Sequence, residues 1–219
     1  MNKIIIFDLD GTLLNTIDDL GHACNHALSA CGYPVHPIED YPRLVGNGVR
    51  KLIERALAAD GVSPEEEVVN RLMGDFVPYY NAHNCDYTRP YEGIPELLAE
   101  LKSRGCQLAV ASNKYQAATE RIVAHFFPGV FDAVYGEREG IPRKPDPQIV
   151  KDIMAQLNEP MVNDQMVLYL GDSLVDRDTA ANAGWPFIAC SWGFVPRRTL
   201  VDAGCRHIID QPGELLHWV

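Results

Sequence analysis

The sequence lacks any long run of apolar residues. No apolar segment approaches the roughly 20 residues that a membrane-spanning helix needs. A single lysine and the four-residue apolar run 4–7 precede Asp8, which is too short for a secretory signal peptide. We therefore expect a cytoplasmic protein without a membrane partner.

Closely spaced cysteines are also missing. None of the six cysteines forms a Cys-x-x-Cys pair, so neither a zinc site nor a thioredoxin-type redox motif is indicated. The seven histidines show no metal-ligand spacing either, and we expect them to be surface or core residues. Free thiols fit the reducing interior of a cell.

Positive charge is in short supply. Nineteen basic residues face 30 acidic ones, which gives a formal charge of −11 with neutral histidines. An acidic surface repels nucleic acid and anionic membranes, so neither is an expected partner. A phosphate substrate would need local lysines or a metal ion to reverse the field at its site.

One apolar stretch near the N-terminus organises the remaining chain. Residues 4–7 (Ile-Ile-Ile-Phe) are typical of a strand that is buried on both faces. The carboxylates of Asp8 and Asp10 follow directly, then Gly11. In a parallel sheet, ligands bind beyond the carboxyl ends of the strands. These two residues are thus placed for chemistry, although a turn with two solvated aspartates would look the same in isolation.

Two such carboxylates repel each other unless a cation or a shared proton lies between them. Mg²⁺ prefers oxygen ligands in octahedral geometry and would relieve this repulsion. The chemistry indicated is attack by one carboxylate on a phosphoryl group, while the other moves protons.

The pattern of elements changes along the chain. Helical periodicity continues from residue 16 to about 83, whereas strands and helices alternate from about 105. The third helix of the first part is expected to begin at Ser63 as N-cap, with Pro64 in its first turn. We therefore predict an α/β fold: a Rossmann-like parallel sheet core, residues 1–15 and 86–219, with an inserted α-helical cap domain, residues 16–85.

Further polar residues follow other predicted strands. Strand 107–111 ends in Ser112, Asn113 and Lys114, and strand 166–170 leads to Asp172 and Asp176. Lys144 lies in a loop before a predicted helix. Serine and acidic residues are also common at helix starts, and a loop lysine can simply be solvated. Together, however, these residues resemble the parts needed for phosphoryl transfer.

In this combination the chain resembles the phosphatases of the haloacid dehalogenase superfamily. The likeness spans nearly the whole chain, and four motifs of that superfamily occur in order: Asp8-Leu9-Asp10-Gly11-Thr12-Leu13, Ser112, Lys144-Pro145-Asp146-Pro147, and Gly171-Asp172-Ser173-Leu174-Val175-Asp176.

The resemblance implies catalytic roles for three residues. Asp8 would be the nucleophile that becomes an aspartyl phosphate. Asp10 would protonate the leaving group and then activate water. Lys144 would neutralise the nucleophile and the phosphate. Dehalogenases of the superfamily lack the second aspartate, so Asp10 favours phosphoryl transfer.

The resemblance also implies binding roles. Ser112 and the amide of Asn113 would hold phosphoryl oxygens, and Thr12 of the first motif is a further candidate for binding substrate. Mg²⁺ is the implied cofactor, and its candidate ligands are Asp8, Asp10 through its backbone carbonyl, Asp172, and Asp176 directly or through water.

The predicted cap carries one unusual stretch, Gly46-Asn47-Gly48, ahead of a helix. Backbone amides at a helix start can bind an anion, and Arg50 or Lys51 could bind a substrate carboxylate. A glycine turn with solvated cations is the competing interpretation. This stretch and Pro90-Tyr91-Glu92-Gly93 resemble the phosphoglycolate phosphatases of the superfamily.

These observations predict a Mg²⁺-dependent phosphatase of a small phosphorylated metabolite, with 2-phosphoglycolate as the leading candidate. Two alternatives stay open: a sugar-phosphate phosphomutase that uses the same aspartyl phosphate, and a non-catalytic phosphate-binding module on the same fold. Either a monomer or a homodimer is compatible with the sequence.

Overall fold

The computed structural model describes residues 3–157 and 166–219, and the chain divides into two compact units. Residues 1–15 and 90–219 form one, which we call the sheet unit; residues 16–89 form the other, the helical unit. The helical unit thus ends at residue 89, and the cap predicted from the sequence ends at residue 85.

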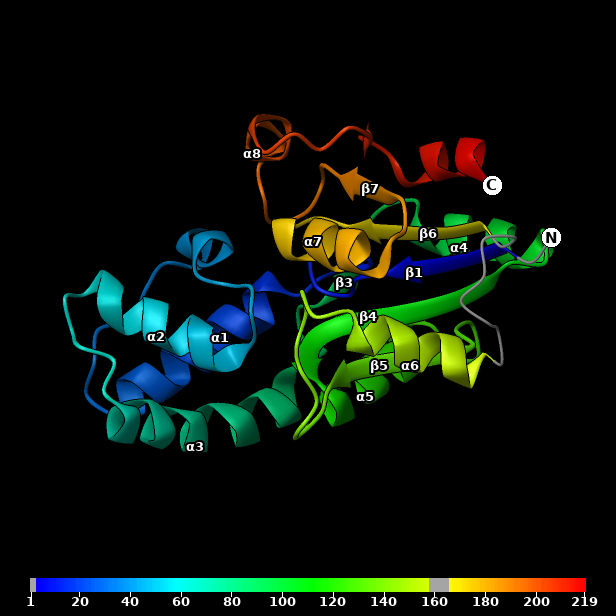
Figure 1. Cartoon of the computed structure of the whole chain (residues 1–219). Helices are drawn as coiled ribbons and strands as arrows, with labels where there is room; N and C mark the ends of the chain where they lie inside the picture. Colours follow the sequence, from blue (N-terminus) through cyan, green and yellow to red (C-terminus); the bar gives the residue numbers. More distant parts are fainter. Residues whose placement is uncertain (1–2, 158–165) are drawn as a thin grey trace. The chain divides into compact units, whose positions relative to one another are not determined.

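The sheet unit is built on six parallel strands in the spatial order β5-β4-β1-β6-β7-β8 (Figure 1). The predicted α/β fold with a parallel sheet is thus confirmed. The strands are β1 (Lys3–Phe7), β4 (Gln107–Tyr115), β5 (Ala133–Glu137), β6 (Met166–Gly171), β7 (Phe187–Cys190) and β8 (Ile208–Ile209).

Strand β1 lies in the middle of this sheet, and its sequence explains why. Residues 4–7 are completely buried. Side chains alternate between the two faces of a strand. Ile4 and Ile6 accordingly share one core cluster with residues of α6 and α7, such as Ile153 and Ala180. A strand covered on both faces has to be apolar throughout, as this one is.

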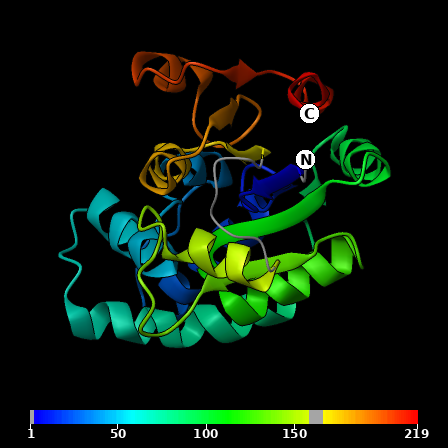
Figure 2. The same ribbon diagram turned by 45° about the vertical axis from the view of Figure 1, so that its right-hand side comes forward.

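Helices cover both faces of the sheet. In Figure 1, α6 and α7 lie on the near side and α4 lies behind it. In Figure 2, the orange and red segments that follow β7 lie at the end of the sheet where β8 is the edge strand. The helices of this unit are α4 (Ile94–Ser103), α5 (Gln116–Phe126), α6 (Gln148–Gln156), α7 (Leu174–Ala183), α8 (Arg197–Asp202) and the 3₁₀ segment η2 (Pro212–Trp218).

The helical unit contains α1 (Ile17–Ala30), η1 (Ile38–Arg43), α2 (Val49–Ala59) and α3 (Glu66–His83). The predicted start of its third helix is wrong: α3 begins at Glu66, after Glu65, and the amide of Glu65 donates to the carbonyl of Ser63 at 2.9 Å. Ser63 is therefore part of a turn before the helix. The short strands β2 (Leu14–Asn15) and β3 (Arg89–Pro90) pair where the chain passes between the units.

Among the helices described for residues 3–157 and 166–219, none has the length and apolar character required to cross a membrane.

Candidate functional site

The carboxyl ends of three neighbouring strands bring the predicted site residues together. Phe7, the last residue of β1, pairs with Leu170 of β6 on one side and with Val110 of β4 on the other. Asp8 continues β1 and donates its amide to the Leu170 carbonyl at 2.9 Å. Because parallel strands end at the same edge, the residues after each of them become neighbours.

Lys144 is buried at this edge and its ammonium contacts several groups. Only 2% of its side chain is exposed, and its Nζ lies 3.0 Å from Asp8 Oδ1 and 2.7 Å from Asp176 Oδ1. The same ammonium donates to the Ala111 carbonyl at 2.8 Å and to the Tyr169 hydroxyl at 3.3 Å. Burial alone lowers the pKa of Lys144, but Asp176 and Asp8 raise it well above its usual value, so the side chain stays charged.

Asp176 is fully buried and has two structural tasks. It is the third residue of α7, and its Oδ2 accepts hydrogen bonds from the amide of Ser173 at 3.1 Å and from the hydroxyl of Ser173 at 2.5 Å. This is a capping box, in which the first turn of the helix is closed reciprocally. Its Oδ1 is bound by Lys144. Both carboxylate oxygens of Asp176 are thus engaged by protein donors.

Three carboxylates converge beside Lys144. Asp8, Asp172 and Asp176 each offer an oxygen, and these oxygens all lie within 4.8 Å of one another. Burial raises the pKa of Asp8 well above its usual value, and the charge of Asp176 adds to the effect, whereas Lys144 opposes it. A charged Asp8 is therefore costly in this cluster unless a further cation compensates.

Asp172 is held at the end of β6 and is nearly inaccessible. Burial, followed by the charge of Asp176, raises the pKa of Asp172 to about 7. The amide of Phe194 opposes this by donating to Asp172 Oδ2 at 2.7 Å. Gly11 packs so closely here that a Cβ would lie 2.4 Å from Asp172 Oδ2, and its φ of +84° also favours glycine.

Asp10 has a partner that the sequence analysis assigned no role. Lys114 Nζ lies 3.1 Å from Asp10 Oδ2, and only 2% of the lysine side chain is exposed. The sequence analysis already placed Lys114 at the end of this strand, but it named no partner for the lysine. Four carboxylates, those of Asp8, Asp10, Asp172 and Asp176, thus face the two ammonium groups of Lys114 and Lys144, leaving a formal charge of −2.

The predicted polar residues of the site have buried or paired side chains. Ser112 is buried, and its hydroxyl accepts from the amide of Lys114 at 3.1 Å. Asn113 pairs reciprocally with the backbone of Lys144, since its Nδ2 donates to the Lys144 carbonyl (3.2 Å) and its Oδ1 accepts from the Lys144 amide (3.0 Å). Its side chain therefore holds the lysine loop. The hydroxyl of Thr12 lies 3.5 Å from Asp172 Oδ1.

Arg50 and Lys51 belong to the helical unit, and their side-chain contacts lie within it. Arg50 donates to Asn70, and Lys51 pairs with Glu54. The preceding residues 46–48 all have positive φ, and α2 begins directly after them. The guanidinium of Arg55 donates to the carbonyls of residues 44–46 and to the side chain of Asn47, which fixes this turn.

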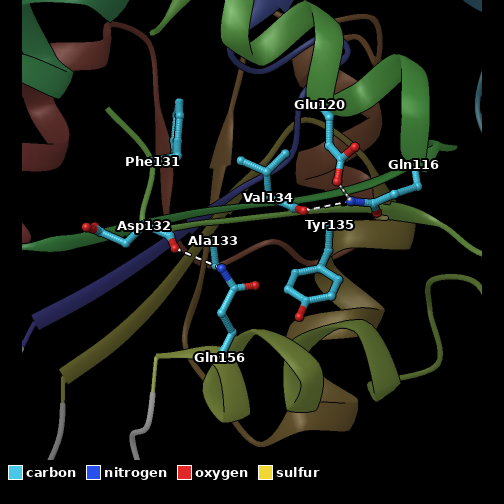
Figure 3. Close-up of a pocket in the computed structure, with 8 residues that line it drawn as sticks. All are labelled: Gln116, Glu120, Phe131, Asp132, Ala133, Val134, Tyr135 and Gln156. Atoms are coloured by element: carbon cyan, nitrogen blue, oxygen red, sulfur yellow. Dashed lines mark hydrogen bonds between the residues drawn. The ribbon is translucent and has the colours of Figure 1, made fainter. Parts of the chain in front are cut away.

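A separate hollow of about 360 Å³ lies along β5, the edge strand of the sheet (Figure 3). Gln116 bridges two groups of this strand: its Nε2 donates to the Val134 carbonyl at 3.0 Å, and its Oε1 accepts from the Gly136 amide at 2.5 Å. Gln156 donates to the carbonyl of Asp132 at 3.1 Å. These amides pair edge groups that would otherwise be open to another strand. None of the predicted site residues lines this hollow.

Residues 5–190 match the family described as haloacid dehalogenase-like hydrolase. A phosphoglycolate phosphatase of Cereibacter sphaeroides is 35% identical over 191 residues, which cover 87% of this chain and 85% of that protein. A crystal structure from Lactobacillus delbrueckii subsp. bulgaricus, whose name assigns it provisionally to the phosphoglycolate phosphatases, has a TM-score of 0.89 at 35% identity and covers 98% of this chain and 97% of that one. CbbY from Rhodobacter sphaeroides in complex with phosphate has a TM-score of 0.80 at 25% identity, with 98% and 96% covered.

Proposed function

The chain belongs to the haloacid dehalogenase-like hydrolase family, and we propose that it is a Mg²⁺-dependent phosphatase that hydrolyses a small phosphorylated metabolite through an aspartyl phosphate on Asp8. The observation that carries this proposal is the contact of one buried ammonium, that of Lys144, with both Asp8 and Asp176 at the edge where Asp172 also lies. The family named in the sequence analysis is the one that matches.

The donor set fits a small, hard divalent cation. Carboxylate oxygens of Asp8, Asp172 and Asp176 lie within 4.8 Å of one another. When Asp10 and the two lysines are counted as well, the four carboxylates and two ammonium groups retain a formal charge of −2. Mg²⁺ prefers such oxygen ligands. We propose that Asp8, Asp172 and the backbone carbonyl of Asp10 hold the ion. Asp176, whose two oxygens already accept protein hydrogen bonds, supports it directly or through water.

When bound, the ion would supply charge neutralisation to the phosphoryl group and to the carboxylate that approaches it. Residues of the chain orient the nucleophile and transfer the protons. Lys144 holds Asp8 Oδ1 at 3.0 Å, and the amide of Leu9 donates to the same oxygen at 2.7 Å, which fixes the carboxylate in orientation. The other oxygen, Oδ2, is the proposed nucleophile.

The proposed chemistry has two balanced steps. In the first, Asp8 Oδ2 forms a bond to phosphorus while the bond from phosphorus to the substrate oxygen breaks, and Asp10 gives its proton to that oxygen. In the second, Asp10 takes a proton from water, and the hydroxyl attacks phosphorus and releases inorganic phosphate from Asp8. An alkyl alcohol is a poor leaving group without a proton, so the first step needs Asp10 as an acid. The second step needs the same residue as a base that activates water.

Three polar residues complete the proposed phosphate site. The hydroxyl of Ser112 and the amide of Asn113 would hold phosphoryl oxygens, and Thr12 would assist beside Asp172. The side chain of Asn113 has a second effect, since its two hydrogen bonds to the backbone of Lys144 hold the lysine loop against β4.

We propose 2-phosphoglycolate as the leading substrate, because a relative that is 35% identical over 87% of this chain is named phosphoglycolate phosphatase. The substrate carries a carboxylate as well as a phosphate. Arg50 and Lys51 are the cations that we assign to that carboxylate. They lie at the start of α2, where the backbone amides also favour an anion.

The test is phosphate release from 2-phosphoglycolate with and without Mg²⁺. We expect steady turnover by the wild type without an activating bisphosphate, and none by Asp8→Asn. Asp178→Asn is the matched control, because Asp178 lies on α7 but is half exposed and pairs with Arg177. Equal rates for the wild type and Asp8→Asn would refute the nucleophile. Isomerisation of a sugar phosphate that requires an activating bisphosphate and releases no inorganic phosphate would indicate a phosphomutase.

A second arm tests the substrate. Lys51→Ala should weaken turnover of a carboxylated phosphate ester more than that of a neutral alkyl phosphate. Lys151→Ala, which removes an exposed lysine from α6, should affect neither. Equal losses on both substrates would remove the role given to Lys51 and leave the proposed reaction intact.

A further inference from the structure

The loop of residues 191–195, which follows β7, lies against the metal-binding edge of the sheet. Strand β7 pairs with β6, and Gly171 is opposite Ala189, so the two strands end side by side. Asp172 continues β6, and the 191–195 loop continues β7. The sequence analysis assigned no role to any residue of this loop.

Backbone amides of the 191–195 loop bind one side of the Asp172 carboxylate. The amide of Phe194 donates to Oδ2 at 2.7 Å, and the amide of Val195 also donates to this carboxylate. These bonds hold the Asp172 carboxylate in a fixed orientation. Hydrogen bonds to a metal-ligating group from the surrounding protein orient that group and tune the metal.

Trp192 fastens the 191–195 loop to the segment after β1. Its indole Nε1 donates to the carbonyl of Thr12 at 3.0 Å. Thr12 is completely buried, and its hydroxyl lies 3.5 Å from Asp172 Oδ1. The loop is therefore tied at one point to the segment that carries Asp8 and Asp10, and at another to Asp172.

Gly193 lets the loop approach Asp172 and Gly11 more closely than a residue with a Cβ could. A Cβ at this position would lie 2.3 Å from Asp172 Cβ and 2.3 Å from the Gly11 carbonyl oxygen. Real Cβ contacts do not reach such distances, so a side chain here would have to displace either Asp172 or the loop. The close approach lets the Phe194 amide reach the carboxylate.

We propose that the 191–195 loop is a positioning segment for the metal-binding carboxylate of Asp172, and that Trp192 and Gly193 set the affinity of the site for Mg²⁺. This inference rests on the proposed function, in which Asp172 holds the ion. Neither residue contacts the reacting atoms. Both act through Asp172, so their effect should fall on metal binding rather than on the chemical step.

The experiment measures Mg²⁺ binding to the full chain by titration calorimetry without substrate, alongside the Mg²⁺ dependence of turnover. Trp192→Phe keeps an aromatic ring and removes the indole N–H donor. We expect its dissociation constant for Mg²⁺ to rise by about 10-fold, the lower end of the range for groups that orient a metal ligand. Turnover at saturating Mg²⁺ should stay close to that of the wild type.

Trp218→Phe is the matched control, because Trp218 is a partly exposed residue of η2 that packs on His207. It should bind Mg²⁺ like the wild type. Gly193→Ala is the second variant, and its clash with Asp172 should raise the dissociation constant at least as much as Trp192→Phe. Circular dichroism confirms that each variant is folded.

Two outcomes would overturn the inference. One is a Mg²⁺ dissociation constant within twofold of the wild type for both folded loop variants. The other is a fall in turnover at saturating Mg²⁺ with unchanged Mg²⁺ affinity, which would indicate a purely structural role. Failure of the proposed function looks different: the wild type itself would neither bind Mg²⁺ nor release phosphate, or Asp172→Asn would bind the ion as tightly as the wild type.

Discussion

Removal of the Lys144 charge is the perturbation whose consequences the structure defines best. In Lys144→Met the side chain keeps a similar length but loses its ammonium. Asp8 Oδ1 and Asp176 Oδ1 then lose a partner at 3.0 and 2.7 Å, respectively. Water cannot readily replace the lost ammonium, because only 12% of the Asp8 side chain and 0% of the Asp176 side chain are exposed.

The magnitude follows from what happens to a buried ion pair when one partner is removed. The remaining charge is left uncompensated, which typically costs about 3–5 kcal/mol in the free energy of unfolding. For a chain of this size, about 1 kcal/mol corresponds to a shift of roughly 2–4 °C in Tm. Without metal, Lys144→Met should therefore melt about 6–20 °C below the wild type.

Lys102→Met is the matched control. Lys102 Nζ also lies 3.0 Å from an aspartate, Asp132, but the two side chains are 37% and 34% exposed. Exposed pairs contribute only about 0–1 kcal/mol to the free energy of unfolding. The two variants remove the same charge at a similar distance, but Lys144 is buried between two carboxylates, whereas Lys102 is exposed and pairs with one. Their comparison therefore measures what the buried carboxylate cluster adds beyond an exposed ion pair.

The assay is thermal unfolding in EDTA near neutral pH, repeated with excess Mg²⁺, and followed by phosphate release. Mg²⁺ should restore part of the lost stability by supplying positive charge to the same carboxylates, whereas turnover should stay abolished. If Lys144→Met melted within about 1 °C of Lys102→Met in EDTA, the lysine would not be stabilising the carboxylate cluster, and the reasoning would be refuted.

Three further outcomes are expected. Asp10→Asn should lower turnover by about 10²–10⁴-fold, the usual contribution of a positioned proton donor, and an unchanged rate would remove that role. Burial raises the pKa of Asp172 from 3.8 to about 7, so the folded protein holds a proton that the unfolded chain releases. Urea titrations in EDTA should therefore show the free energy of unfolding falling as the pH rises from about 4 to about 7, and falling less with Mg²⁺. A free energy of unfolding that rises over this range would contradict the reasoning. Gln116→Ala removes two hydrogen bonds to the edge strand and should lower the free energy of unfolding by about 1–3 kcal/mol, more than Gln156→Ala, which removes one. If urea unfolding showed a smaller loss for Gln116→Ala than for Gln156→Ala, these amides would not be stabilising the strand edge.

Local sequence determined the sheet unit and the residues at its edge. The apolar run 4–7 is typical of a buried strand, and the helical periodicity after residue 16 separated the inserted segment from the alternating strands and helices. Asp8 and Asp172 follow strands directly, so their place at the carboxyl edge needed no tertiary information. The family expected from these motifs is the one that matches.

Tertiary structure decided what those residues touch. Three contacts join residues that are distant in the sequence: Lys114 with Asp10, Lys144 with Asp176, and the indole of Trp192 with the Thr12 carbonyl. The physical reason is that periodicity and caps report on neighbours along one element. A side chain's charge partner and its desolvation depend on which other strands end beside it, and that is fixed only when the sheet has formed.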